Sequence, residues 1–283
     1  MRPKLSIITP SLNQGKFIER TIRSVLDQGY ENLEYLIVDG GSTDSTVETI
    51  RRYEDRIAWW VSEPDAGQTD ALNKGLARAT GDVIAYINSD DYYLPGAFET
   101  ALGVLQRGGA SWMAGAARFV DENDRLTEIW RPRPPWTYES VFKGRHWWAL
   151  APWSVPQPSA FWTRGLQEEV GPFRLDLDYV FDTEFFLRLV YAGHYPELTD
   201  EELSVRVVHP DAKSANPAAF RAEAGKLVPI CRPAMTRSER RRLLLSRILL
   251  WVTPPLRAIR ERLFAALGRL RRALAGRGTP DSL

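Results

Sequence analysis

Acidic side chains that could bind a metal ion or accept a proton lie in short polar segments of the chain. Asp39, Asp65 and the pair Asp90-Asp91 each follow an apolar run, and Asp182 lies at the start of a later helical pattern. Carboxylate oxygens are the preferred ligands of Mg²⁺ and Mn²⁺, and an ionised carboxylate can act as a general base. These residues therefore predict metal-assisted or acid–base chemistry.

The elements expected to position these residues alternate between strand and helix. Apolar runs predict strands at residues 5–9, 33–38, 57–62 and 82–88, with a later strand at 203–209, and apolar spacing predicts helices at 17–26, 46–53 and 69–79, with a later helix at 178–192. This alternation implies a mainly parallel sheet with helices on both faces. Ligands bind at the carboxyl ends of such strands, so the polar loops at 10–13, 39–42, 64–67 and 88–91 should converge on one edge.

Five segments of the chain together resemble family 2 glycosyltransferases. They are SIITPSLNQG, EYLIVDGGSTDST, SEPDAGQTDALNKG, ATGDVIAYINSDD and DYVFDTEFFLRL, and their order and spacing match over residues 4–215. The resemblance implies the GT-A fold, an α/β Rossmann-like arrangement. Residues 1–110 would form a nucleotide-sugar-binding half, and residues 111–235 an acceptor-binding half that carries the catalytic base.

The resemblance also implies roles for individual residues. The donor site would comprise Pro10, Ser11, Asn13, Asp39, Asp65, Gly67, Asn88 and Ser89, the metal site Asp90, Asp91 and His209, and the catalytic base would be Asp182. Two positions depart from the family. Asn88 replaces the first acid of the metal-binding triplet, and Leu72 stands where an arginine is common. Metal affinity would then depend on Asp90 and Asp91.

The implied activity is inverting transfer of a sugar from a nucleoside diphosphate, most readily UDP, to a hydroxyl of a glycan or lipid-linked acceptor in cell-surface polysaccharide synthesis. Mn²⁺ or Mg²⁺ would neutralise the leaving diphosphate. Asp182 would accept the proton of the acceptor hydroxyl. The remaining acceleration would come from positioning of the two substrates.

Other interpretations remain open from the sequence. Asp39 could shape a turn, and Asp182 could favour a helix N-terminus electrostatically. His209 could be structural. A catalytically silent module that binds nucleotide sugar or carbohydrate would keep the same fold. A nucleotidyltransferase fits less well, because the first strand is not followed by a basic glycine-rich loop.

Tryptophans are concentrated between residues 130 and 162. They are Trp130, Trp136, Trp147, Trp148, Trp153 and Trp162. Aromatic faces suit sugar rings, although large aromatic residues more often form cores. We expect an acceptor site that includes Trp147, Trp148, Trp153 and Gln157.

The C-terminal part of the chain differs in charge from the rest. Residues 236–283 contain twelve arginines and three acidic residues, a net charge of +9, whereas the rest of the chain carries −8. Two amphipathic helices, at 238–252 and 256–275, predict a peripheral anchor on an anionic membrane, with a solvated helix or an oligomer contact as the alternative. The acidic body argues against a nucleic-acid partner.

Cysteine content and the N-terminal residues bear on location. Cys231 is the one cysteine among 283 residues, so no intrachain disulfide can form. The first residues, MRPKLSIITPSLN, lack the long apolar segment of a secretory signal. We expect a cytoplasmic protein, peripheral on the inner face of the cytoplasmic membrane.

Overall fold

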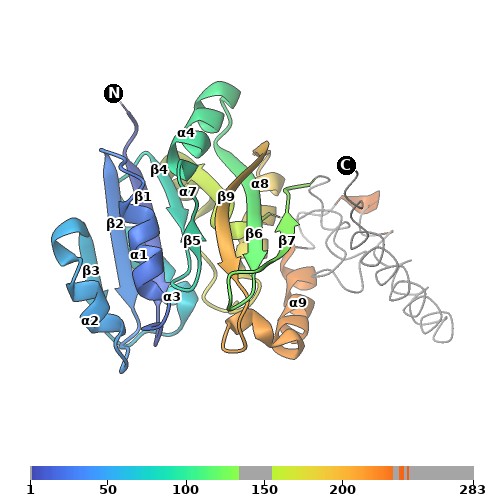
Figure 1. Ribbon diagram of the computed structural model, residues 1–283. Coiled ribbons are helices and arrows are strands. Elements are labelled where there is room, and N and C mark those ends of the chain that lie inside the picture. The colour runs from blue at the N-terminus through green and yellow to red at the C-terminus, as the bar shows by residue number, and fades with distance from the viewer. Residues whose placement is uncertain (1, 134–154, 232–235, 239–240, 242–283) are drawn as a thin grey trace, which may run out of the picture. The chain divides into compact units, whose positions relative to one another are not determined.

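The computed structural model describes residues 2–133, 155–231, 236–238 and 241 (Figure 1). Its contacts divide the chain into one unit at Met1–Ala234 and another at Met235–Leu283. The predicted acceptor residues Trp147, Trp148 and Trp153 lie outside the described residues, as does nearly all of the predicted tail at 236–283. The fold below is that of the first unit.

Nine strands of the described chain form one mixed sheet, in the order β3-β2-β1-β4-β8-β6-β9-β5, with β7 paired to β6. The first four strands along the chain are parallel, as the sequence predicts: β1 (Leu5–Ser11), β2 (Leu33–Asp39), β3 (Trp59–Ser62) and β4 (Val83–Tyr86). Their carboxyl ends therefore lie along one edge of the sheet.

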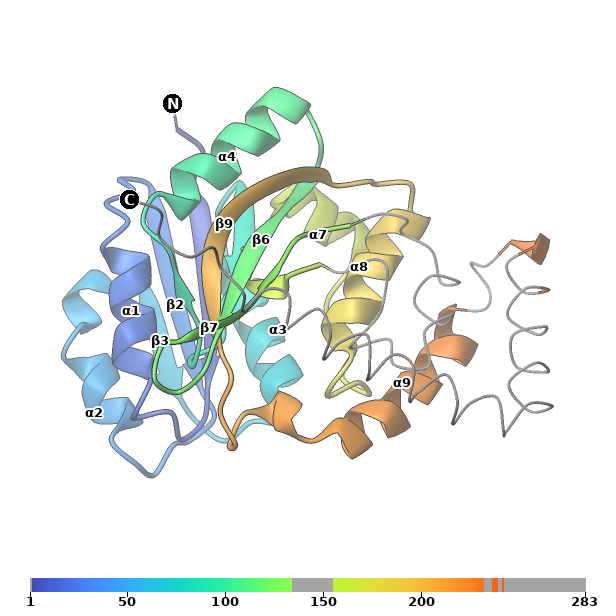
Figure 2. The ribbon, with the colours of Figure 1, turned by 45° about the vertical axis from the view of Figure 1, so that its right-hand side comes forward.

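Helices α1 (Ile18–Leu26) and α3 (Gln68–Arg78) cover opposite faces of these strands (Figures 1 and 2). Side chains alternate along β1, so Ile7 packs with the α1 side chains, whereas Ile8 faces α3. At Gly75 of α3 an added Cβ would lie 2.5 Å from Cγ2 of Ile8. Glycine at this position lets α3 approach the sheet closely.

The second half adds strands of both directions. They are β5 (Tyr92–Tyr93), β6 (Trp112–Val120), β7 (Leu126–Trp130), β8 (Ala160–Thr163) and β9 (Glu197–Val207). Of their pairings only β6 with β9 is parallel. The strand predicted from residue 203 begins at Glu197, because a polar stretch that shows no apolar pattern still pairs with β6.

The remaining helices connect and cover these strands. They are α2 (Thr46–Arg51), α4 (Ala97–Gly108), α7 (Arg164–Val170), α8 (Phe181–Tyr191) and α9 (Pro217–Cys231), with short 3₁₀ turns η1 (Glu54–Arg56), η2 (Gln157–Ser159) and η3 (Lys213–Ala215). Helix α8 carries the predicted base, and α9 follows the loop that contains His209. Among the described residues, no helix has the length and apolar character needed to span a bilayer.

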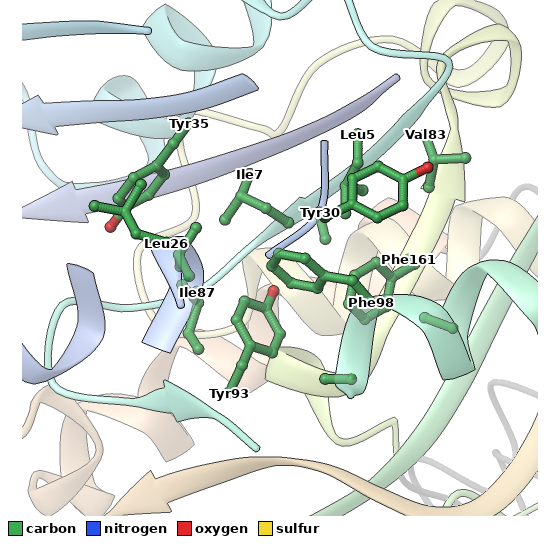
Figure 3. Close-up of a cluster of buried hydrophobic side chains, with 14 of the residues drawn as sticks. Leu5, Ile7, Leu26, Tyr30, Tyr35, Val83, Ile87, Tyr93, Phe98 and Phe161 are labelled. Atoms are coloured by element: carbon green, nitrogen blue, oxygen red, sulfur yellow. The ribbon is translucent and has the colours of Figure 1, made fainter. Parts of the chain in front are cut away.

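One hydrophobic core extends across both predicted halves of the first unit. Tyr93 packs against Phe98 and Phe161 with ring centroids 5.0 and 5.8 Å apart, and Figure 3 shows the three rings together. The same cluster contains Leu5 of β1 and Leu203 of β9. Residues on either side of position 110 therefore share a core, so the two predicted halves pack as one body.

Candidate active site

Three parallel strands end in polar residues at the same level of the sheet. Ser11 pairs in register with Asp39, and Asp39 pairs with Ser62. Hydrogen bonds tie the ends of these strands and the loops that follow them to one another. The predicted convergence of polar loops is therefore observed.

Asp39 is fully buried and shapes the turn after β2. Its Oδ2 accepts hydrogen bonds from the backbone N–H groups of Gly41 (3.2 Å) and Ser42 (2.9 Å) and from Oγ of Ser62 (2.6 Å). Its Oδ1 accepts from Oγ of Ser42 (2.5 Å). These bonds are those of a turn-forming aspartate, and its role in the donor site stays a prediction.

The loop after β1 is fixed to the loop after β2 by Asn13. This residue has a φ of 53°, its N–H donates to Oγ of Ser42 (2.7 Å), and its Oδ1 accepts from the N–H of Thr43 (2.9 Å). Pro10 and Ser11 are buried at the end of β1. Oγ of Ser11 has no hydrogen-bond partner in the structure. An orphaned buried hydroxyl at this edge fits a site that a ligand completes.

The loop after β3 lies beside the loop after β2. Oδ1 of Asp65 accepts a hydrogen bond from the N–H of Gly67 (2.8 Å), whose φ of 112° precedes the first turn of α3. An added Cβ at Gly40 would lie 2.7 Å from Oδ2 of Asp65. The backbone after β2 can approach Asp65 this closely only because residue 40 is a glycine.

The loop of residues 88–91 is held by groups from α1 and β9. Oγ of Thr21 donates to the carbonyl oxygens of Ser89 (2.9 Å) and Asp91 (2.6 Å). Asp91 is 2% exposed, and its Oδ1 accepts from the N–H of Val207 (3.0 Å) while its Oδ2 lies 3.4 Å from Nδ2 of Asn88. Both oxygens of Asp91 are thus used inside the protein, and burial together with the neighbouring charge of Asp90 raises its pKa well above the ordinary value.

Asp90 contacts His209 at this edge of the sheet. Oδ2 of Asp90 lies 3.1 Å from Nε2 of His209, and the imidazole packs on Phe17 with ring centroids 4.5 Å apart. His209 is 3% exposed, and its Nδ1 has no hydrogen-bond partner.

The described residues contain no group of three or more His, Cys, Asp or Glu side chains that could hold a metal ion. Asp90 and His209 alone nevertheless fit Mg²⁺ or Mn²⁺, since these ions take few protein ligands and complete their shell with water and phosphate oxygens. The donor set is a carboxylate and an imidazole that already lie in contact. The pair is therefore the candidate metal site.

Asp182 lies in the first turn of α8. Its Oδ1 accepts a hydrogen bond from the N–H of Thr183 (2.6 Å). Desolvation raises the pKa of this carboxyl, and the hydrogen bond from Thr183 and the charges of Arg206 and Lys213 only partly oppose that effect. A carboxyl with a raised pKa is a stronger base once ionised, which suits proton abstraction from a hydroxyl.

Two cations near the site were not predicted from the sequence. Nζ of Lys213 donates to Oε1 of Gln68 (3.1 Å) and to Asp178, and Nε2 of Gln68 donates to Oδ1 of Asn88 (2.7 Å). The sequence signal that could have indicated Lys213 is its position four residues after His209, in the same polar loop. Arg206 interacts electrostatically with Asp91 and Asp182. In the sequence, Arg206 is distinguished only as a charged residue within the mainly apolar run of residues 203–207.

The predicted acceptor residue Gln157 is 9% exposed, and its Nε2 donates to the carbonyl oxygen of Tyr86 (2.9 Å). The two tryptophans of this segment that the structure describes pack on aromatic neighbours. Trp162 is buried against Phe185 at 5.2 Å, and half-buried Trp130 contacts Phe119 at 4.4 Å. For Trp162, the core explanation of the tryptophan-rich segment holds.

The fold and the site together define a class of protein. An open α/β sheet with polar loops at its parallel strand ends, a carboxylate–imidazole pair and a buried aspartate at the start of a later helix is the arrangement that the resemblance to family 2 glycosyltransferases implies. The model of glycosyl transferase family 2 matches residues 6–154, and the chain belongs to this family. The resemblance noted in the sequence is confirmed.

Relatives share this assignment. The chain is 32% identical over 191 residues to the uncharacterized glycosyltransferase Rv1514c of Mycobacterium tuberculosis, covering 66% of this chain and 68% of the relative. It is 31% identical over 140 residues to WfgD of Escherichia coli, a UDP-Glc:alpha-D-GlcNAc-diphosphoundecaprenol beta-1,3-glucosyltransferase, covering 49% of this chain and 55% of WfgD.

A solved structure supports the fold. The mannosyltransferase PcManGT from Pyrobaculum calidifontis, in complex with GDP-Man and Mn²⁺, superimposes with a TM-score of 0.63 at 21% identity, covering 99% of this chain and 77% of that one. At this identity the comparison concerns the fold alone, and it confirms the predicted α/β architecture of the GT-A type.

Proposed function

We propose that this glycosyltransferase moves a sugar from a nucleoside-diphosphate donor to an acceptor hydroxyl with inversion at the anomeric carbon. The observation that carries the proposal is the position of Asp182 and of the Asp90–His209 pair. All three residues belong to one compact unit of the fold. A group that abstracts a proton and a pair that can hold a metal ion are the two requirements of this chemistry.

The donor would bind against the loops after β1, β2 and β3. Pro10, Ser11 and Asn13 would line the nucleotide pocket with Asp39, Asp65 and Gly67, while Asn88 and Ser89 would reach the ribose. The free Oγ of Ser11 supports this placement. UDP is the proposed nucleotide, because the name of WfgD specifies a UDP-sugar donor.

A divalent cation, Mn²⁺ or Mg²⁺, would be held by Asp90 and His209 and would neutralise the charge on the leaving diphosphate. Asp91, predicted as a further ligand, has both oxygens engaged by Val207 and Asn88. Its proposed part is to fix the loop that presents Asp90. Lys213 would add a positive charge near the phosphates, where α3 has Leu72 in place of an arginine.

Asp182 would accept the proton of the acceptor hydroxyl. As that oxygen forms its bond to the anomeric carbon, the bond from this carbon to the phosphate oxygen breaks, and its electron pair remains on the diphosphate. The proton ends on the carboxylate of Asp182. Attack from the face opposite the leaving group inverts the configuration. General-base assistance of this kind is worth about 10²–10⁴-fold in rate.

The proposed acceptor is a glycan or lipid-linked sugar, in cell-surface polysaccharide synthesis. The acceptor of WfgD, by its name, is a diphosphoundecaprenol-linked sugar, which supports a lipid-linked acceptor here. Trp147, Trp148, Trp153 and Gln157 are the proposed acceptor contacts. The basic tail at 236–283 would hold the enzyme on the cytoplasmic face of an anionic membrane.

The test is hydrolysis and transfer with a panel of nucleoside-diphosphate sugars, each with and without Mn²⁺. We expect turnover with a UDP-sugar that depends on metal and on Asp182. Tight donor binding by thermal shift with no turnover for any donor, metal or acceptor would instead identify a silent nucleotide-sugar-binding module.

A further inference from the structure

The turn that leads into α8 is held by a residue from another helix. Backbone N–H groups of Asp178, Tyr179 and Val180 all donate to Oε2 of Glu223, with distances of 2.8 Å from Asp178 and 3.1 Å from Val180. Glu223 lies on α9 and is 7% exposed. Figure 2 shows α9 beside the chain that enters α8.

Helix α8 lacks an N-cap side chain of its own. Its N-cap residue is Val180, which has no side-chain oxygen to accept from the first turn. The N–H groups at this end of a helix require partners from elsewhere. Glu223 supplies a charged acceptor for the N–H of Val180 and of the two residues before it, and charge-assisted hydrogen bonds are the stronger kind.

A second residue of α9 contacts the same turn. Nζ of Lys226 donates to the carbonyl oxygen of Asp176 (3.2 Å) and lies 3.6 Å from Oε1 of Glu223. Asp182 follows Val180 by two residues, so the direction of its side chain depends on how this turn is set. Besides the bond from Thr183 to Asp182, Glu184 and Arg188 make polar contacts one to two turns further along α8.

We propose that Glu223 is a positioning residue for sugar transfer: it fixes the start of α8 and thereby aims Asp182 at the acceptor hydroxyl. This inference rests on the proposed function of Asp182 as base. The hydrogen bonds of Glu223 go to backbone N–H groups of residues 178–180 and not to Asp90, His209 or Asp182, so we expect it to act mainly on the chemical step. A misplacement of about 1 Å can cost roughly 10²-fold in rate.

The experiment compares Glu223→Ala, Glu223→Gln and the control Glu168→Ala in the full chain. Glu168 is exposed on α7 and pairs with Arg164 one turn away. Glutamine keeps an acceptor oxygen at the same reach, whereas alanine removes it. The readouts are kcat and KM for the donor, thermal stability, and hydrogen–deuterium exchange of peptides that span residues 174–186.

We expect Glu223→Ala to lower kcat about 10- to 100-fold with donor KM unchanged, and to speed exchange in residues 178–184. Glu223→Gln should recover most of both losses, and Glu168→Ala should change neither. Unchanged kcat in folded Glu223→Ala protein would overturn the positioning role. Unchanged hydrogen–deuterium exchange in residues 178–184 of Glu223→Ala would also overturn the positioning role, and this measurement needs no substrate. A third outcome is faster exchange in Glu223→Ala together with no sugar transfer by the wild-type protein. This outcome would contradict the proposed function, but it would still show that Glu223 fixes the start of α8.

Discussion

Asp90 and His209 are 119 positions apart in the chain, yet Oδ2 of Asp90 lies 3.1 Å from Nε2 of His209. The contact joins the loop after β4 to the loop after β9. Neither residue could hold a divalent ion by itself, whereas the pair offers oxygen and nitrogen ligands in adjacent positions.

The first prediction concerns this pair. Replacing either Asp90 or His209 by alanine should lower metal-dependent kcat by about 10²-fold or more, since it removes a group that stabilises the charge developing on the leaving diphosphate. The fold should persist, because neither side chain belongs to the main hydrophobic cluster. Steady-state kinetics over a Mn²⁺ titration, with circular dichroism as the folding control, provide the check. Wild-type turnover in either variant would remove that residue from the metal site.

The second prediction concerns the base. Asp182→Asn should lower transfer about 10²–10⁴-fold while donor affinity is kept, because the amide cannot accept a proton. Transfer kinetics and calorimetric titration with the nucleotide separate these effects. Asp55→Asn, at an exposed position of η1, is the matched control. Near-normal transfer by Asp182→Asn would mean that another residue is the base.

The third prediction follows from the raised pKa of Asp182. Desolvation disfavours its ionised form, so transfer should fall with decreasing pH through a pKa above the ordinary 3.8. The same burial makes ionised Asp182 unfavourable for folding near neutral pH. Asp182→Asn should therefore raise Tm at pH 7, and the difference should vanish below pH 3.8, where the carboxyl is protonated in both the folded and the unfolded protein. A lower Tm for Asp182→Asn at pH 7 would contradict this account.

The fourth prediction concerns stability at the opposite end of the sheet. Burial alone would raise the pKa of Glu34, but hydrogen bonds from Lys4, Ser6 and Thr80 outweigh it and lower that pKa to about 2. A lowered pKa stabilises the folded state fully above the ordinary value of 4.5, and this contribution is lost as the pH falls towards 2.

Glu34→Ala should accordingly lower the free energy of unfolding by roughly 1–3 kcal/mol at pH 7, because it leaves buried donors without an acceptor. Urea denaturation at pH 7 and at pH 3 measures the effect, which should shrink at the lower pH. Glu31→Ala, three residues earlier and exposed, should be nearly neutral. Equal stabilities of the two variants at pH 7 would show that the Glu34 network contributes nothing.

The fifth prediction concerns the tail. Deleting residues from Ser238 onward should release the protein from anionic vesicles and spare donor hydrolysis. Each Lys or Arg near an anionic surface contributes about 1 kcal/mol, and the apolar stripe adds burial at the headgroup boundary. Binding of the full chain should weaken as salt rises, since surface charges are screened. Equal co-sedimentation of full-length and truncated protein would show that the tail is not the anchor.

Strand and helix periodicity predicted the first half of the fold well, because every parallel strand there is apolar and ends in polar residues. The second half was harder to predict. The first part of β9, residues 197–202, pairs with β6 although it shows no apolar pattern. The start of β9 was therefore predicted six residues late. Burial by a neighbouring segment, and not local sequence, decides such positions.

The same reasoning applies to the site. The sequence placed Asp90 in a loop and His209 at the end of a strand, but it could not show that Asp91 turns inward to accept a hydrogen bond from the N–H of Val207. Nor could it indicate Glu223, which looks like an ordinary surface acid of an amphipathic helix. Contacts between residues this distant in the chain depend on tertiary packing, which a single sequence does not reveal.

Two neighbouring residues of the loop after β4 contact the chain at the C-terminal end of β9. Asp91 accepts a hydrogen bond from the N–H of Val207, and Asp90 contacts His209 just beyond the strand. The candidate metal site therefore cannot form until the last strand of the sheet has docked. During synthesis, the loops after β1, β2 and β3 emerge long before residue 209. A nascent or C-terminally truncated chain would have these loops without the Asp90–His209 pair, so chemistry that needs the proposed metal ion would begin only once folding of the sheet is complete.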